Sequence, residues 1–395
     1  MDIKNERYLY HRNDLYMLYI INSILTQRNL VQPNERLLIA VSGGQDSICM
    51  VKIISHLRSK WNWKLGIVNC DHGWNSISKL QSIFVSEIAK NLKIDYYQSI
   101  FIKPTKCEKS ARRWRYESIQ RIADSHNYTL ILTAHNASDR IETLLYNISR
   151  GSGITGIQAL NWVKYVYKEQ LFQIENSYQN KSLIYLNYLQ NINITYLQNK
   201  TIRIVRPFLS ITRTQIRKLL LDWKLSVWPD PTNNYCQLRR NFIRKHLLPY
   251  MRLYLNLNLD KVLAQWTELI NGENVYFSQL ANLIRLKIEK IVVDEKRRMH
   301  IILNINMLSS LPIVLQRKII QQSIHIHTEN KINYSQIEQI RLLYFCNTQK
   351  PIKPKYLIGS SNCIKNEHNL YQKELNFRTI KIYLLSNNII IQYNF

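Results

Sequence analysis

Short apolar runs alternate with amphipathic segments over the first half of the chain, and this alternation is its main structural signal. Two runs, 36–41 and 64–70, have the length and continuous apolar character of strands buried in a parallel sheet, and 94–102 and 129–133 are also expected to be strands. The segments between and before them show the apolar spacing of helices: 14–27, with Asp14 as N-cap, 48–57, 78–91 and 110–126. Strands that alternate with helices predict a doubly wound α/β domain, in which ligand-binding turns lie at the carboxyl ends of the strands.

The second half of the chain reads differently. Residues 164–200 are rich in Tyr, Asn, Gln and Leu without a clear period, and we expect an insertion or a long hairpin there. Helical patterns follow at 212–223, at 239–251, which is strongly basic, and through 259–345. Apolar runs at 377–384 and 389–395 flank Ser386, Asn387 and Asn388, which predicts a β-hairpin.

These patterns predict a parallel-sheet catalytic domain followed by a small helical domain and a short β module. The expected boundaries are a catalytic domain at 1–225, with an insertion at 163–200, a basic linker helix region at 226–258, a helical domain at 259–345 and a C-terminal module at 346–395.

The amino-acid composition indicates which class of molecule the protein binds. The chain has 54 Lys plus Arg against 27 Asp plus Glu, a net charge of +27, which favours a polyanion and nucleic acid first of all. Part of the lysine content follows from a sequence crowded with Asn, Ile, Lys and Tyr, as AT-rich coding produces. No apolar run approaches the roughly 20 residues of a membrane helix. Acidic residues near the start argue against a signal or transit peptide, so we expect the protein to work where it is made.

Cysteine spacing argues against metal–sulfur chemistry. The six cysteines are scattered and none forms a C-x-x-C pair, which leaves a thiolate zinc site, an iron–sulfur cluster and a redox pair without support.

The strongest chemical signal is the segment SGGQDS at 42–47, between a buried strand and a helix. Its two glycines let the backbone approach a ligand closely, and the N–H groups at the start of a helix form an anion cradle. The residues expected to bind phosphate groups, which the resemblance given below implies are those of ATP, are Ser42, Gly43, Gly44, Gln45, Asp46 and Ser47. Asp46 also offers a carboxylate for Mg²⁺. Since the Walker lysine is missing, the loop is expected to hold a pyrophosphate rather than drive γ-phosphoryl transfer.

A second signal lies in HNASDRIETLLYNISRG at 135–151. Asn136 is placed to cap a helix with Asp139 at its third position, in a capping-box arrangement. Residues Ile141, Leu144, Leu145 and Ile148 form the expected buried stripe. Asp139 and Glu142 fall together on another face, with His135 just ahead. Two carboxylates on one face suit a cationic amine, although a solvated acidic face is the simpler interpretation.

Two basic helices complete the candidates. Glu108, Arg112 and Arg115 share a helix face, and either arginine is placed to neutralise charge on a phosphate. The segment 239–251 carries a group of cations suited to a nucleic-acid backbone, which would be that of tRNA if the resemblance described next holds: Arg239, Arg240, Arg244 and Lys245. A solvated ion pair and a solvated basic face are the corresponding structural alternatives.

SGGQDS after a buried strand resembles the PP-loop of the ATP pyrophosphatases. Other segments are similar, in the same order, to the tRNA(Ile)-lysidine synthetase family: CDHGW at 70–74, EKSARRWRY at 108–116, TAHNASDRIETLLYNISRGSGITGIQAL at 133–160, VRPF at 205–208, DPTN at 230–233, RRNFIRKHLLPY at 239–250 and LPIVLQRKII at 311–320. The sequences around DHGW and SDRIETLLYN resemble those of the cyanobacterial and plastid branch of this family. The chain departs from the family in 164–200 and in its shorter tail.

The resemblance implies that ATP adenylates the wobble cytidine of a tRNA(Ile) with a CAU anticodon and that L-lysine then displaces AMP to form lysidine. It implies Mg²⁺ at Asp46, a part for His135 with Arg112 or Arg115 in adenylation, and lysine binding by Asp139 and Glu142. It also implies a plastid stroma location, with the bacterial cytoplasm as the alternative, and leaves a homodimer open. Two other functions stay open on the residues alone: a PP-loop tRNA thiolase, and a non-catalytic basic tRNA-binding protein.

Overall fold

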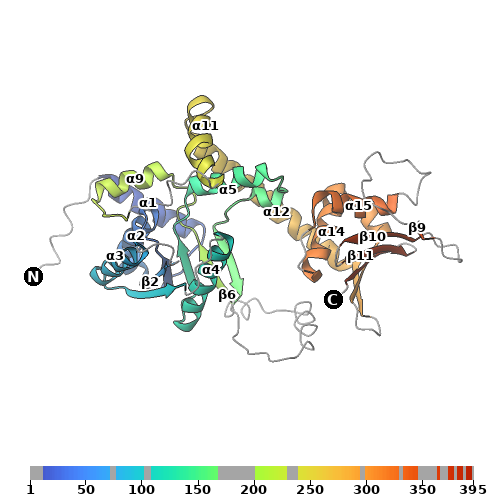
Figure 1. Cartoon of the computed structure of the whole chain (residues 1–395), viewed down its shortest axis with the longest axis horizontal. Helices are drawn as coiled ribbons and strands as arrows, with labels where there is room; N and C mark the ends of the chain where they lie inside the picture. The colour runs from blue at the N-terminus through green and yellow to red at the C-terminus, as the bar shows by residue number, and fades with distance from the viewer. Residues whose placement is uncertain are drawn as a thin grey trace, which may run out of the picture. The chain divides into compact units, whose positions relative to one another are not determined.

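The computed structural model describes residues 12–71, 77–101, 108–167, 201–228, 239–293, 299–328, 332–345, 363–364, 372–377, 380–385 and 388–393. The chain divides into two compact units, labelled along the chain in Figure 1. The first comprises Met1–Ser152 and Gly156–Thr267, and the second Gly153–Thr155 and Glu268–Phe395. Within the described ranges, every helix is too short or too polar to cross a membrane.

The first unit is built on a six-stranded sheet in the order β3-β2-β1-β4-β6-β5. Its strands are β1 (Arg36–Ala40), β2 (Lys64–Asp71), β3 (Asp95–Ile100), β4 (Leu130–Thr133), β5 (Val163–Tyr167) and β6 (Thr201–Val205). All neighbours pair in parallel except β5 and β6, which are antiparallel. Its helices include α1 (Arg12–Gln27), α2 (Gln45–Trp61), α3 (Ile77–Asn91), α4 (Glu108–Ser125), α5 (Ala137–Ser149), the short α6 (Ile154–Ile157) and α9 (Arg213–Asp222). The predicted α/β class is confirmed.

Helices cover both faces of this sheet. Leu37 and Ile39 of β1 face a core shared with α1, α2, α3 and α9, whereas Leu38 faces a smaller core shared with α4. Alternate residues of one strand therefore enter different cores, because side chains of a strand point to opposite faces. Burial on both faces explains the continuous apolar runs that the sequence showed.

Three expected boundaries differ from the structure. Helix α1 begins at Arg12, so Asp14 lies inside its first turn and is not the N-cap. Helix α2 begins at Gln45 rather than 48, which places the end of the SGGQDS segment on the helix itself. The start of the expected insertion, Val163–Tyr167, is an edge strand paired with β6, and residues 168–200 lie outside the described ranges.

The predicted basic helix is present, but its middle is wound differently. It consists of α10 (Arg239–Phe242), a π-helical turn η3 (Ile243–Leu247) and α11 (Leu248–Tyr254). The amide of Leu248 bonds to the carbonyl of Ile243, five residues back. Pro249 follows, and its missing N–H prevents the ordinary bond to Lys245. The wider turn is thus a consequence of the proline, and such turns recur at functional sites.

The second unit combines helices with an antiparallel sheet in the order β7-β8-β12-β11-β10-β9. Its strands are β7 (Glu289–Val293), β8 (Met299–Asn304), β9 (Cys363–Ile364), β10 (Gln372–Phe377), β11 (Ile380–Leu385) and β12 (Asn388–Tyr393). Its helices are α13 (Ile305–Ser309), α14 (Ile313–Thr328) and α15 (Tyr334–Phe345), and α12 (Leu259–Ile288) begins in the first unit. The predicted hairpin is confirmed as β11 and β12, paired from Leu385 and Asn388 outward.

The helical prediction for 259–345 is wrong at β7 and β8. Both segments are short and rich in Ile and Val, and short apolar runs cannot be assigned to helix or strand by periodicity alone. Strand β8 pairs with β12, so the C-terminal strands share one sheet and one core with the helices before them.

Candidate active site

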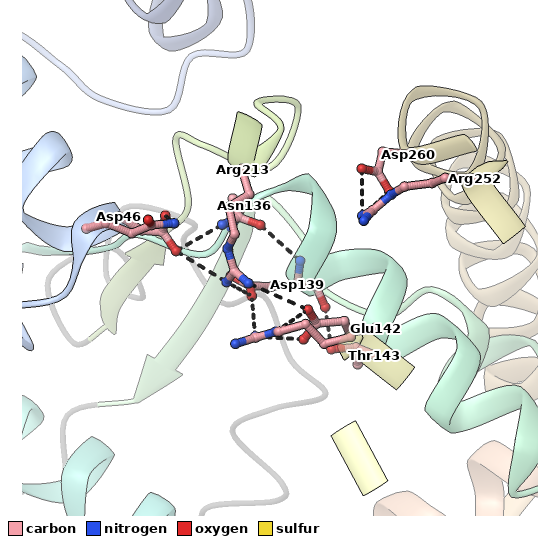
Figure 2. Close-up of polar contacts among 10 residues, drawn as sticks. Asp46, Asn136, Asp139, Glu142, Thr143, Arg213, Arg252 and Asp260 are labelled. Atoms are coloured by element: carbon pink, nitrogen blue, oxygen red, sulfur yellow. Dashed lines mark hydrogen bonds and ion pairs between the residues drawn. The ribbon is translucent and has the colours of Figure 1, made fainter. Parts of the chain in front are cut away.

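The candidate site lies at the point in the sheet where the order of strand addition reverses. Strand β1 neighbours both β2 and β4, so the connections leaving β1 and β4 run to opposite sides and open a crevice at their carboxyl ends. The SGGQDS loop follows β1, and His135 and Asn136 follow β4. Two segments about 90 residues apart in sequence therefore meet, as Figure 2 shows for Asp46 and Asn136.

The loop after β1 has the conformation of an anion cradle. Gly43 has φ of +78°, a left-handed value that favours glycine. A Cβ there would lie 3.1 Å from the side chain of Gln81 and 3.4 Å from Trp228, so the loop has no room for one. Gly44 is the N-cap of α2 and no side chain caps the helix, which leaves its first amides directed at the crevice.

The two serines hold the loop in shape. Ser47 Oγ is buried, donates to the carbonyl of Gly44 at 2.9 Å and accepts from the amide of Ser42 at 3.3 Å. Ser42 Oγ accepts from the amide of Gly44 at 3.4 Å. Gln45 donates to Asp46 Oδ1 at 3.2 Å. The sequence placed all of these at the phosphates, and that role stays a prediction; in this structure both hydroxyls act on the loop itself.

Three carboxylates and two arginines form the centre of the site, which we call the acid–arginine cluster: Asp46, Asp139, Glu142, Arg213 and Arg244. Arg244 Nε donates to Glu142 Oε1 at 2.6 Å and its Nη2 to Glu142 Oε2 at 2.8 Å, a bidentate pair. The same Nη2 lies 3.3 Å from Asp139 Oδ1. Figure 2 shows Asp46, Asp139, Glu142 and Arg213 of this cluster close together.

Arg213 joins the nucleotide loop to the acid pair. Its Nη2 lies 3.5 Å from Asp46 Oδ2 and 3.3 Å from Asp139 Oδ1. Asn136 adds a second link, since its Nδ2 donates to Asp46 Oδ2 at 3.0 Å. The side chain of Glu142 is 4% exposed, so its bidentate arginine compensates an almost fully buried charge.

Sequence reasoning missed Arg213 and the second role of Asn136. Thr212 caps α9 in a capping box with Gln215, which fixes Arg213 as the first residue of the helix. A cation at a helix N-terminus is unfavourable by itself because the helix dipole is positive there. That position was the available signal that an acidic partner lies opposite.

The capping box predicted at Asn136 is confirmed. Its Oδ1 accepts from the amide of Asp139 at 3.0 Å, and Asp139 Oδ2 accepts from the amide of Asn136 at 3.1 Å. The predicted buried stripe is correct for Ile141 and Leu144, whereas Ile148 is exposed, near the end of the helix. Asp139 thus has one oxygen on the helix cap and the other on the two arginines.

Charge around Asp46 favours a cation. Burial raises the pKa of its carboxyl, Arg213 opposes that rise and the negative charge of Asp139 adds to it. Two carboxylates that repel each other beside an anion cradle are a setting in which Mg²⁺ binds, through one or two carboxylates and the phosphates of its substrate. Among the described residues, no group of three His, Cys, Asp or Glu side chains forms a complete metal site.

His135 is uncharged at neutral pH. Burial, together with the charges of Arg206, Arg112 and Arg115, lowers its pKa to about 4 against the opposing effect of Asp139. Its Nδ1 lies 3.0 Å from Thr133 Oγ1. A neutral imidazole can donate a hydrogen bond here, but the positive charge for a phosphate must come from elsewhere.

Arginines surround His135. Arg112 and Arg115 both lie close enough to act on it, as the sequence required of whichever arginine serves the phosphate. The Arg112 guanidinium lies 5.4 Å from the ring centre of Tyr116, while Arg115 is exposed. Arg206, which sequence reasoning did not single out, is buried and donates to the carbonyl of Asn161 at 2.5 Å.

The four cations of the basic helix take different positions. Arg244 enters the acid–arginine cluster, and Arg240 lies over the ring of Tyr146 at 5.6 Å. Arg239 and Lys245 are exposed. The expected tRNA contacts stay a prediction for all four, and the exposed pair is the one positioned for them without rearrangement.

Comparison with known proteins identifies the family. A family model described as a PP-loop domain matches residues 17–251. A chloroplastic tRNA(Ile)-lysidine synthase of Staurastrum punctulatum is 40% identical over 375 residues, covering 87% of this chain and 76% of that protein. The chain belongs to the tRNA(Ile)-lysidine synthase family. A chloroplastic member from Zygnema circumcarinatum is 37% identical, covering 85% of this chain and 81% of that protein. A member from Nostoc sp. is 33% identical, covering 82% and 87%.

Membership of the lysidine synthase family establishes that the chain is a PP-loop enzyme that uses ATP. It also separates two of the functions that the residues alone left open, because relatives that carry the whole architecture are named as synthases rather than thiolases.

Proposed function

We propose that this protein ligates L-lysine to the wobble cytidine of a tRNA(Ile) with a CAU anticodon, through an adenylated cytidine. The ligation converts that cytidine to lysidine and changes codon reading from AUG to AUA. One observation carries the proposal beyond family membership: the phosphate cradle and the acid pair belong to one connected site, joined by Asn136 and Arg213. Adenylation and lysine transfer need such an arrangement, because the carbonyl oxygen at position 2 of the cytosine must first attack the α-phosphate of ATP, releasing pyrophosphate. The lysine amine must then attack the adjoining carbon, releasing AMP.

For the first step, the amides at the start of α2 and the loop from Ser42 to Ser47 would hold the phosphates of ATP. Mg²⁺ would bind Asp46 and supply charge that favours departure of pyrophosphate. Arg112 or Arg115 would neutralise charge on the α-phosphate, and neutral His135 would donate a hydrogen bond. The target base must leave its stack to reach this crevice.

For the second step, Asp139 and Glu142 would bind lysine. Their contacts with Arg244 support this assignment, since both acids already hold a cationic side chain with good geometry. Lysine would therefore have to displace Arg244. A released guanidinium on the basic helix would then be available to the tRNA backbone, which reconciles its position here with the contact expected from sequence.

The attacking amine must be neutral. A carboxylate beside an amine raises the amine's pKa and favours its charged form, so gripping both amines with acids would block the reaction. We infer that one acid holds the α-ammonium and the other accepts the proton of the side-chain amine as attack proceeds. The lowered pKa of His135 makes it a weaker proton acceptor than an ordinary histidine.

The names of the relatives bear on the location of the protein but not on its assembly. The two chloroplastic relatives support a plastid, and we propose the stroma. The homodimer stays an untested prediction.

The test is incubation with ATP, radiolabelled lysine and CAU-anticodon tRNA, followed by nucleoside analysis. Wild type should form lysidine. Asp46→Asn or Ser47→Ala should abolish adenylation, whereas Asp139→Asn and Glu142→Gln should leave adenylated tRNA that accumulates label from the α-phosphate. We expect lysine transfer to fall at least ~100-fold at one of the two acids, the cost of an unpaired buried charge.

Loss of adenylation in both acid variants with unchanged lysine affinity would move these residues to the ATP step. Absence of lysidine from the wild-type reaction, with tRNA bound, would leave only the non-catalytic alternative.

A further inference from the structure

The basic helix presents a row of exposed rings. Phe242, His246, Tyr250 and Tyr254 follow one another at every fourth position, and we call them the aromatic stripe. Phe242, Tyr250 and Tyr254 are 55%, 61% and 67% exposed, and His246 is exposed as well. Large apolar side chains are not kept in water over several turns without a use, and such surfaces mark binding sites.

The rings are ordered in pairs. The centres of Phe242 and His246 lie 5.1 Å apart with their planes inclined by 36°, and those of Tyr250 and Tyr254 lie 4.5 Å apart with an inclination of 39°. The stripe extends over about 18 Å at the rise of a helix.

The helix beneath the stripe is anchored on its other side. Ile243 and Leu248 are buried in a small core with Ile141 of α5 and Leu259 of α12. Arg252 donates to both carboxylate oxygens of Asp260, at 3.0 and 2.9 Å, which ties the end of α11 to the start of α12 (Figure 2). The rings therefore stand on a fixed support.

The charge beside the stripe selects its partner. Residues 239–254 contain five arginines and lysines and no acidic residue. Arg239 and Lys245 are exposed on the same helix as the rings. Aromatic rings interleaved with cations fit single-stranded nucleic acid, in which bases stack on the rings and phosphates meet the cations.

The place of the helix narrows the partner further. Arg244, between Phe242 and His246 in sequence, reaches Glu142 at the centre of the site. The stripe thus begins within one helical turn of Arg244, whose guanidinium contacts the acids that would hold lysine. We propose that the aromatic stripe stacks unpaired bases of the tRNA anticodon loop that flank the modified cytidine. This inference rests on the proposed function and adds the surface that would keep the target base unstacked from its neighbours.

The experiment measures RNA binding without ATP or lysine. The probes are an anticodon stem–loop with a CAU anticodon and a blunt duplex of the same stem. Tyr250→Leu with Tyr254→Leu removes two flat faces and keeps apolar bulk and helix propensity, and the corresponding Phe pair restores the faces. Tyr165→Leu with Tyr276→Leu is the matched control, because these tyrosines are 63% and 62% exposed elsewhere in the chain.

The Leu pair should weaken stem–loop binding at least ~10-fold, in keeping with the loss of stacking on one or more bases. Duplex binding and the salt dependence should stay as in wild type, and the Phe and control pairs should bind normally. A 2-aminopurine beside the target cytidine should report stacking on wild type that the Leu pair loses.

Three results would overturn the proposal: normal stem–loop binding by the Leu pair, equal weakening on the duplex, or a change in sedimentation with RNA binding intact, which would assign the stripe to a second copy of the chain. Failure of the proposed function is distinguishable, since wild type itself would then form no lysidine. If the Leu pair binds the stem–loop normally and the wild type forms lysidine, only the role proposed for the aromatic stripe is excluded.

Discussion

At the scale of a single residue, Arg244 bears on both proposed substrates, lysine and tRNA. Its guanidinium satisfies Glu142, whose side chain is 4% exposed, yet it occupies the position proposed for lysine. The same contact therefore contributes to stability and competes with substrate. Removal of this side chain should therefore lower stability and raise the affinity for lysine.

Arg244→Ala should lower the free energy of unfolding and tighten lysine binding together. We expect a loss of about 2 kcal/mol, below the roughly 3–5 kcal/mol of a fully buried pair, because the arginine is partly exposed. Denaturant unfolding and lysine titration measure the two effects. Arg217→Ala, an exposed arginine of α9, should change neither. Weaker lysine binding by Arg244→Ala would show that the arginine assists lysine rather than displacing it.

His135 should leave a signature in the pH dependence of stability. Its pKa is lowered from 6.5 to about 4, so between these values the unfolded chain binds more protons than the folded one. Folding stability should therefore be complete above pH 6.5 and fall as the pH drops toward 4. His135→Asn removes the titration, and the difference in unfolding free energy between variant and wild type should change only in this window. A constant difference would contradict the buried neutral state.

At the scale of elements, the N-terminus of α5 has two tasks. Asn136 closes the capping box through Oδ1 and reaches Asp46 through Nδ2. One residue thereby fixes where the helix begins and where the carboxylate beside the phosphate cradle points.

Asn136→Ala should have an effect beyond the loss of stability that follows removal of an ordinary helix cap. Removal of a cap costs about 1 kcal/mol, and Asn304→Ala at the start of α13 should show that loss alone. Asn136→Ala should in addition lower ATP–pyrophosphate exchange by about an order of magnitude, since a hydrogen bond to a charged group is lost. Thermal unfolding and the exchange assay read the two effects. Equal exchange in both variants would mean that Asp46 is positioned by Arg213 alone.

At the scale of the whole molecule, the net charge of +27 favours RNA binding only where cationic side chains lie together at the surface. Arg240 and Arg244 are engaged with Tyr146 and the acids, while Arg239 and Lys245 remain at the surface of the same helix. The exposed pair is therefore the better probe of contact with RNA.

Arg239→Ala with Lys245→Ala should make the salt dependence of tRNA binding shallower. Two lost phosphate contacts should reduce the log–log slope by about 1.4 on single-stranded RNA. Filter binding over a salt series measures it. Lys90→Ala with Lys93→Ala removes the same charge near the start of β3, at the amino edge of the sheet, and should leave the slope unchanged. Equal effects of the two pairs would mean that binding follows net charge rather than this surface.

The local pattern of the sequence determined much of this protein. Apolar runs and helical spacing predicted the strands and helices of the first unit, and the glycines of the SGGQDS segment predicted a turn that the φ of Gly43 bears out. The capping box at Asn136 was readable because both partners lie within three residues. Features of this kind depend on neighbours in sequence.

Tertiary structure alone decided the rest. Arg213 and Arg244 join acids 74 to 167 residues away only because the strand order places the ends of β1 and β4 side by side. The low pKa of His135 arises from burial and from arginines of other elements. Strand β8 was misread as helix because its partner β12 lies at the far end of the chain, and β7 pairs in turn with β8. Periodicity records which face a residue buries, whereas charge pairing and sheet partners depend on which distant segments the fold brings together.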